Sequence, residues 1–322
     1  MANNEFLYAV AVVRANELAL LSGQDLEQLI TAPDYKKAVA MLTDKGYDEP
    51  DGTDYSAMLD AQLEKTWELL KTNAPEAEGL NTFVVKNDFQ NLKACLKAEI
   101  ADVDAKEYLV RPCVIEHDFL LDCVSQRKFD DLPEFISEAA KKGFDTVTKT
   151  GNGQLCDVIL DSATIKAMQY FAKLSGDELL TEYADTFALA ADIKTAVRSA
   201  RTDKGEGFIE AALVETPYID IAALSQAAVE GEQAVLELLD ESKLADYRAA
   251  LESGASVFEK YCDDKLLAIV KKAKYSAMGI GPLAAYYIAR ETEIKSLRII
   301  LSAKISGASA DTVRERMREL YV

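Results

Sequence analysis

One helical pattern recurs about every hundred residues along this chain, and such a triplication favours a fold built from three related units. Its first landmark is a helix with an aspartate near its start, in LDAQLEKTWELL (Asp60), LDSATIKAMQYF (Asp161) and CDDKLLAIVKKA (Asp263). The aspartates are 101 (161 − 60) and 102 (263 − 161) residues apart. We expect all three to lie near helix starts, where acidic side chains interact favourably with the helix dipole.

A second landmark follows in each copy, in NLKACLKA from Asn91, DIKTAVRS from Asp192 and SLRIILSA from Ser296. Turn-forming residues recur as well, at 48–54, 150–153 and 252–256, just before each aspartate-bearing helix. In every copy three apolar or small residues fall at helical spacing and predict one buried stripe: Phe89, Leu92 and Leu96; Ala190, Ile193 and Val197; Ile294, Leu297 and Leu301.

The predicted fold class is all-α, with three similar helical lobes of about a hundred residues each. Good helix formers dominate the chain, and its 322 residues include only seven prolines. We place the repeats at residues 1–105, 106–205 and 206–322, the last with an added C-terminal helix in DTVRERMRELYV. That helix should pack back on the third lobe through Val313, Met317 and Leu320. The lobes could close in a pseudo-threefold ring or stack as a short solenoid.

Composition narrows the classes of function. A formal net charge of −19 disfavours nucleic-acid and anionic-membrane binding, but it suits docking to a basic protein. No run of about 20 apolar residues predicts a membrane span. The first residues, MANNEFLYAVAVVRANE, predict a helix, because Glu5 and Arg14 do not suit a signal peptide. The five cysteines are scattered and odd in number, which indicates a reduced, intracellular chain.

The residues of common catalytic sites are scarce, so we predict no catalytic residue, cofactor or metal. His117 is the one histidine, which argues against most acid–base and nucleophilic triads. A zinc site would need Cys113 and His117 together with Cys123 or Asp118, yet these cysteines look like packing positions. The phosphate-binding pattern GxxxxGK[ST] is absent. Asp157 and Asp161 lie four residues apart and could share a cation, or could simply mark a helix start.

Basic residues recur at matching places after the second landmark and form a candidate partner interface. One interpretation is three equivalent basic edges around an axis. The alternative is pairing within each helix and coverage of its last turns by cations. The candidate interface residues are Lys93, Lys97, Lys194, Arg198, Lys295 and Arg298.

Three stretches together resemble one known family: FLYAVAVVRANELALLS, ETEIKSLRIILSAKISG and the closing RERMRELYV. They are similar to the C subunit of archaeal-type and bacterial V-type ATPases (ATP synthases), a relative of the d subunit of the vacuolar enzyme. The resemblance runs from about residue 6 to the end. A D–NLK–L pattern, which the family carries in triplicate, is intact from Asp88 to Lys93. The second copy departs from it, with Leu189 and Asp192 at the first two polar places, and the third has Glu293 and Ser296.

The resemblance implies a funnel of three pseudo-threefold lobes that acts as a non-catalytic rotor subunit of the central stalk. Its partners would be central shaft subunits of the D and F type and the membrane proteolipid ring. It would lie peripherally on the cytoplasmic side of the membrane and serve proton or sodium transport. The three turn segments would then lie at one level and are candidates for partner contact.

Two other functions remain open on the sequence. A helical adaptor or scaffold unrelated to a pump would show no membrane association. A metal-dependent hydrolase would use acidic clusters such as Asp157 and Asp161, and would bind stoichiometric metal.

Overall fold

The chain is described by a computed structural model that covers residues 6–74, 77–101 and 103–322. Within these residues the fold contains sixteen α-helices and four short 3-10 helices, and no β-strand beyond two isolated bridge pairs. The all-α prediction is therefore confirmed. The helices group into two compact units, one made of Met1–Ala77 and Gly254–Val322 and the other of Glu78–Ser253.

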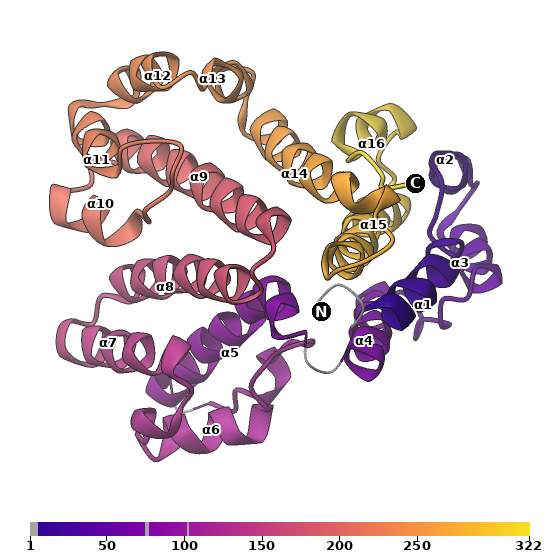
Figure 1. Ribbon diagram of the computed structural model, residues 1–322, viewed down its shortest axis with the longest axis horizontal. Helices are drawn as coiled ribbons and strands as arrows, with labels where there is room; N and C mark the ends of the chain where they lie inside the picture. The colour runs from indigo at the N-terminus through magenta and orange to yellow at the C-terminus, as the bar shows by residue number, and fades with distance from the viewer. Residues whose placement is uncertain (1–5, 75–76, 102) are drawn as a thin grey trace. The chain divides into compact units, whose positions relative to one another are not determined.

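The first unit combines the two ends of the chain. It is centred on α15 (Gly281–Ser306), which packs against the helices around it (Figure 1). These are α1 (Leu7–Glu17), α2 (Gly23–Thr31), α3 (Tyr35–Asp44), α4 (Tyr55–Asn73), α14 (Ala255–Lys271), η5 (Lys272–Tyr275) and α16 (Ala310–Arg316). Because α15 is covered on nearly every side from Gly281 to Leu301, even Arg290 and Glu293 are buried.

The second unit contains the long helices α5 (Asn81–Ala101), α8 (Gly153–Leu174) and α9 (Glu178–Arg201), which run side by side in that order (Figure 1). Shorter helices cover them: η2 (Glu78–Leu80), η3 (Lys106–Tyr108), α6 (His117–Ser125), η4 (Phe129–Asp131), α7 (Glu134–Thr150), α10 (Glu206–Ala212), α11 (Ile221–Glu230), α12 (Glu232–Glu241) and α13 (Ala245–Glu252). Helix α7 approaches closely at Gly143, where an added Cβ would lie 3.2 Å from Leu96 Cδ1.

Local sequence explains where many helices begin and end. Ser22 and Asp25 form a capping box at the start of α2, and Asp54 and Asn152 accept amide hydrogen bonds at the starts of α4 and α8. Gly151 ends α7 with φ of 64°, a left-handed conformation that favours glycine. The turn segments at 48–54, 150–153 and 252–256 lie where predicted, immediately before or overlapping the first residues of α4, α8 and α14.

The repeated apolar stripes are buried as predicted. All nine residues of the three triplets lie in the core of α5, α9 and α15, and none is more than 9% exposed. Residues 6–17 contain the predicted helix as α1, although residues 1–5 lie outside the described part. No helix in the described ranges combines the length and the apolar character needed to cross a bilayer.

The C-terminal helix is shorter than predicted, because it ends at Arg316 and not near Val322. Val313 is buried against α2 and α15, and Met317 and Leu320 pack on the same core cluster, so the expected contacts form. Beyond Arg316 an extended chain lets the Glu319 amide donate to Asp264 of α14, and Tyr321 contact Lys274. A continued helix would not make these contacts.

Candidate functional site

In the second unit, the predicted basic residues of α5 pair with acidic residues of α8. Lys93 forms an ion pair with Asp161, and the Lys97 ammonium lies 2.8 Å from an Asp157 carboxylate oxygen. Arg198 of α9 lines the same open pocket of about 700 Å³ as Lys93 and Lys97. Three of the six candidate interface residues therefore lie together on this unit.

The first unit repeats this arrangement between α15 and α4. Arg298 lies 2.5 Å from the Asp60 carboxylate, and its second guanidinium nitrogen donates to Ser56 Oγ at 2.7 Å. Lys295 lies 3.4 Å from Asp263 of α14, which also pairs with Arg318 at 2.9 Å. Lys194, the remaining candidate, is exposed on α9.

The prediction that these aspartates lie near helix starts is wrong. Asp60, Asp161 and Asp263 do not lie in first turns, because the helices begin at Tyr55, Gly153 and Ala255. Their carboxylates face neighbouring helices and pair there with cations, which accounts for their recurrence. Of the alternative interpretation, pairing within one helix is seen for Lys295, 3.9 Å from Glu291, and Arg198 lies in the last turn of α9.

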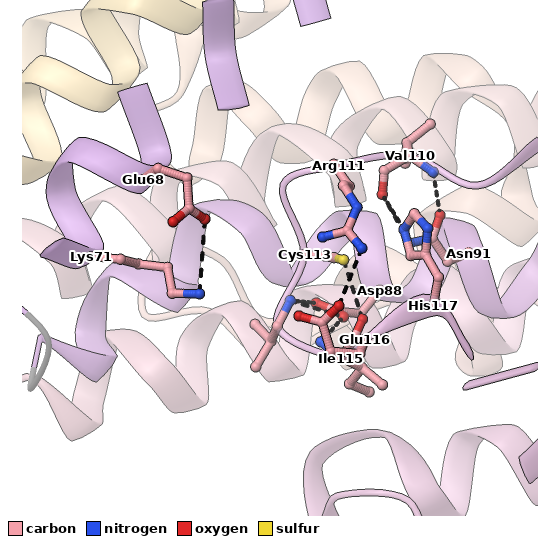
Figure 2. Close-up of polar contacts among 11 residues, drawn as sticks. Glu68, Lys71, Asp88, Asn91, Val110, Arg111, Cys113, Ile115, Glu116 and His117 are labelled. Atoms are coloured by element: carbon pink, nitrogen blue, oxygen red, sulfur yellow. Dashed lines mark hydrogen bonds and ion pairs between the residues drawn. The ribbon is translucent and has the colours of Figure 1, made fainter. Parts of the chain in front are cut away.

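The D–NLK–L pattern marks a buried polar contact that the sequence did not assign. Asp88 is fully buried on α5 and accepts hydrogen bonds from the backbone amides of Val114 and Ile115, at 3.0 and 2.7 Å. Figure 2 shows this carboxylate beneath the loop that enters α6. One turn on, Asn91 accepts from the Val110 amide at 2.7 Å. The two side chains hold the incoming loop to α5.

Buried carboxylates also lie in the other two copies of the pattern, at the Asn91 place on α9 and at the acidic place on α15. Asp192 on α9 is fully buried and accepts from the Val214 amide at 3.1 Å. Glu293 on α15 is 2% exposed, accepts from the Leu21 amide and the Tyr47 hydroxyl, and pairs with Arg290. Asp88 and Asp192 therefore bind segments 26 and 22 residues further along the chain, and Glu293 binds a segment 272 residues earlier.

Burial changes the proton affinity of these groups. It raises the pKa of Asp88 to about 7, although the amides of Ile115 and Val114 favour the charged form. Burial likewise raises the pKa of Asp192 to about 8, opposed by the Val214 amide and reinforced by Glu215.

The residues considered for zinc make other contacts. Cys113 Sγ lies 3.2 Å from the carbonyl oxygen of Ile115, and His117 Nε2 donates to the Val110 carbonyl at 3.1 Å (Figure 2). Across the described ranges no group of three or more His, Cys, Asp or Glu side chains could hold a metal ion. All five cysteines are free thiols. Asp157 and Asp161, the pair considered for a hydrolase, are bound by lysines.

Comparison with known proteins gives one consistent result. The model of the ATP synthase (C/AC39) subunit family matches residues 9–316. The C subunit of the V-type sodium ATPase of Enterococcus hirae is 26% identical over 320 residues, covering 96% of this chain and 97% of that protein. The C subunit of the A-type ATP synthase of Thermococcus kodakarensis is 22% identical, with 98% and 91% covered. That of Methanobrevibacter smithii is 25% identical, with 93% and 84% covered.

Proposed function

The chain belongs to the ATP synthase (C/AC39) subunit family of V/A-type rotary ATPases, as a structural rather than catalytic subunit, and we propose that it works in the rotor. In this role it is a socket that couples the central shaft to the membrane proteolipid ring for ion transport. It lies peripherally on the cytoplasmic side of the membrane. The observation that carries the proposal is the family match over residues 9–316, which leaves little of the chain for another activity.

The proposed architecture is three similar lobes, residues 1–105, 106–205 and 206–322, around a pseudo-threefold axis. The contact pattern supports it in two places, where the second long helix of one proposed repeat packs on the first long helix of another. Helix α5 packs on α8 in this way, and α15 packs on α4. The contact from the third repeat back to the first is expected for a closed ring and absent from an open solenoid.

A socket that transmits torque must resist twisting at each joint between repeats. The buried carboxylates serve this purpose, since Asp88, Asp192 and Glu293 each fix the backbone of the next repeat where a slip would break a desolvated hydrogen bond. The surface ion pairs favour one orientation of the paired helices more than they stabilise the joint, because exposed ion pairs are individually weak.

The proposed partners are shaft subunits of the D and F type and the proteolipid ring. A net charge of −19 suits docking to basic loops, and charge pairing permits reversible detachment. The turn segments at 48–54, 150–153 and 252–256 are the proposed contact points, because they occupy corresponding places in the three repeats. The E. hirae relative is named for a sodium ATPase and others for A-type ATP synthases, so proton and sodium coupling both remain compatible with the proposal.

The test is a mild-detergent purification of the tagged chain from its own membranes, followed by mass identification and an ATPase assay. We expect proteolipid, shaft and nucleotide-binding subunits to co-purify with ATPase activity. Recovery of other proteins alone, with an intact pump that lacks this chain, would overturn the rotor role and favour an adaptor. Charge reversal in 48–54 and at Glu252, with a charge introduced in the uncharged segment 150–153, should then lower assembly, and unchanged assembly would rule those segments out.

A further inference from the structure

Two open pockets lie at corresponding places in different repeats, one within each unit. The first, of about 700 Å³, is lined on one side by α5 and on the other by α8 and α9. The second, of about 430 Å³, lies between α15, the start of α4 and the segments around α14 and α16. Lys93, Ala94, Lys97, Ala98 and Ala101 line the first, and the residues 205 positions later (298 − 93) line the second: Arg298, Ile299, Ser302, Ala303 and Ser306.

The pockets share an electrostatic character as well as a position. Three cations line the first, Lys93, Lys97 and Arg198, against the two carboxylates of Asp157 and Asp161. Three arginines line the second, Arg298, Arg316 and Arg318, against the single carboxylate of Glu259. The lining of each pocket therefore holds more cations than carboxylates, on a chain whose net charge is −19, although Asp60 and Asp263, outside the second lining, pair with Arg298 and Arg318.

Each pocket also presents one guanidinium that is not used by the fold. Lys93 and Lys97 are neutralised by Asp161 and Asp157, and Arg298 by Asp60. The side chains of Arg198 and Arg316 are exposed, and neither forms an ion pair or hydrogen bond with any other described residue. An arginine held beside a surface of this kind can bind a carboxylate through two parallel hydrogen bonds.

We propose that these two pockets are equivalent docking sites for acidic segments of a protein partner, with Arg198 and Arg316 as the carboxylate-binding residues. The proposal rests on the proposed rotor function and names the chemistry of a partner at the candidate basic residues. Charge complementarity selects an acidic occupant. Most of the negatively charged surface repels an acidic segment, and the two pockets do not.

The walls favour a polypeptide segment as the occupant. Val103 and Tyr108 line the first pocket and are 57% and 62% exposed, so they offer apolar and aromatic surface beside Arg198. Tyrosine and arginine together are typical of residues that dominate protein–protein binding energy. The corresponding positions of the second pocket, Ala308 and Val313, are smaller, which fits its smaller volume.

Site-specific photo-crosslinking in cells tests the proposal. The photoreactive amino acid p-benzoylphenylalanine replaces Tyr108 of the first pocket in one variant and Ser306 of the second pocket in another, so that both arginines remain. A third variant carries it at Lys149, an exposed residue on α7 that pairs with Asp145 and lines neither pocket. After irradiation the tagged chain is purified and the crosslinked peptides are identified by mass spectrometry.

We expect the probes at 108 and 306 to crosslink to Asp- or Glu-rich segments of other ATPase subunits, and the probe at 149 not to. Crosslinks to neutral or basic segments, to lipid, or back into this chain would overturn the pocket proposal while the rotor function stands. Crosslinks to acidic segments of a protein outside the ATPase would support the pocket chemistry and overturn the rotor function.

Charge exchange gives a second, independent measurement. Arg198→Glu should weaken retention of the crosslinked partner on the order of tenfold, and Lys149→Glu should leave it unchanged. Replacing the identified acidic residue of the partner with lysine should restore retention to the Arg198→Glu variant. Equal retention by Arg198→Glu and the unaltered chain would overturn the role of Arg198.

Discussion

Glu293, in the last long helix, accepts a hydrogen bond from the backbone amide of Leu21, which lies 272 residues earlier in the chain. The same carboxylate accepts from the Tyr47 hydroxyl and pairs with Arg290, whose side chain is 3% exposed. The two ends of the chain are thus joined through a buried charge, and not only through apolar packing. Removing one partner of a buried ion pair costs much of the free energy of unfolding, so a substitution at Glu293 should have a large effect.

Glu293→Gln should destabilise the first unit by about 3 kcal/mol, because it leaves the Arg290 guanidinium buried without a counter-charge. Trp67, the single tryptophan, reports on this unit alone: it is buried in α4 with its ring centroid 5.7 Å from that of Tyr287. Urea unfolding followed by Trp67 fluorescence should show a lower midpoint. Asp88→Asn, in the second unit, is the matched control and should leave the Trp67 transition in place. An unchanged midpoint in Glu293→Gln would show that this buried pair does not hold the chain ends together.

Stability of the second unit should decrease as pH rises, because Asp192 binds its proton more tightly when folded. Its pKa is raised from 3.8 to about 8, so the neutral form is favoured in the native state. The stabilisation is complete below pH 3.8 and is lost as pH rises through that window to about 8, on the order of 5 kcal/mol. Asp192 Oδ2 is buried without a hydrogen-bond partner among the described residues, which suits a protonated oxygen.

Urea unfolding followed by circular dichroism at pH 5, 7 and 9 measures this effect. Asp192→Asn keeps an oxygen that can accept from the Val214 amide and removes the titration, so its stability should vary less with pH. In Asp88→Asn the stability should vary less with pH between 3.8 and about 7, since the pKa of Asp88 is about 7. Identical pH profiles for both variants and the unaltered chain would contradict the assignment.

The ion pairs between repeats should contribute little to stability. Arg298→Met or Lys93→Met should change the free energy of unfolding by less than about 1 kcal/mol, because both pairs have at least one exposed partner. Reversing a pair, with Arg298→Asp and Asp60→Arg together, should recover whatever either single change loses. A double-mutant cycle in urea provides the measurement, and a coupling energy well above 1 kcal/mol would show that these pairs hold the repeats together.

Helical periodicity predicted which face of each long helix is buried, but not which helix covers it. Phe89, Ile193 and Leu297 are all in the core, as the repeat required. The sequence did not predict that Lys93 pairs with Asp161 of α8. A period of 3.6 residues shows which face of a helix is buried, but it does not show which helix covers that face. The acidic position of the D–NLK–L pattern was visible, yet its function depended on a loop arriving from about 26 residues away.

The extended C-terminal segment should stabilise the first unit through Tyr321. Its ring is 3% exposed and lies 5.5 Å from the Lys274 ammonium, its carbonyl accepts from the same ammonium at 3.3 Å, and its hydroxyl lies 3.4 Å from an Arg14 nitrogen. Arg14 in turn donates to the carbonyls of Ala273 and Ser276, at 2.8 and 2.9 Å. Tyr321 therefore packs over the turn that joins α14 to α15.

Tyr321→Ala should lower the stability of the first unit by about 3 kcal/mol, because it removes a buried aromatic side chain together with the contact to Arg14. Tyr321→Phe keeps the ring and should cost about 1 kcal/mol or less. Trp67 fluorescence in urea separates the two, and Val322→Ala, at an exposed neighbouring position, is the control. If Tyr321→Ala and Val322→Ala unfold at the same urea concentration, the last residues lie on the unit without stabilising it.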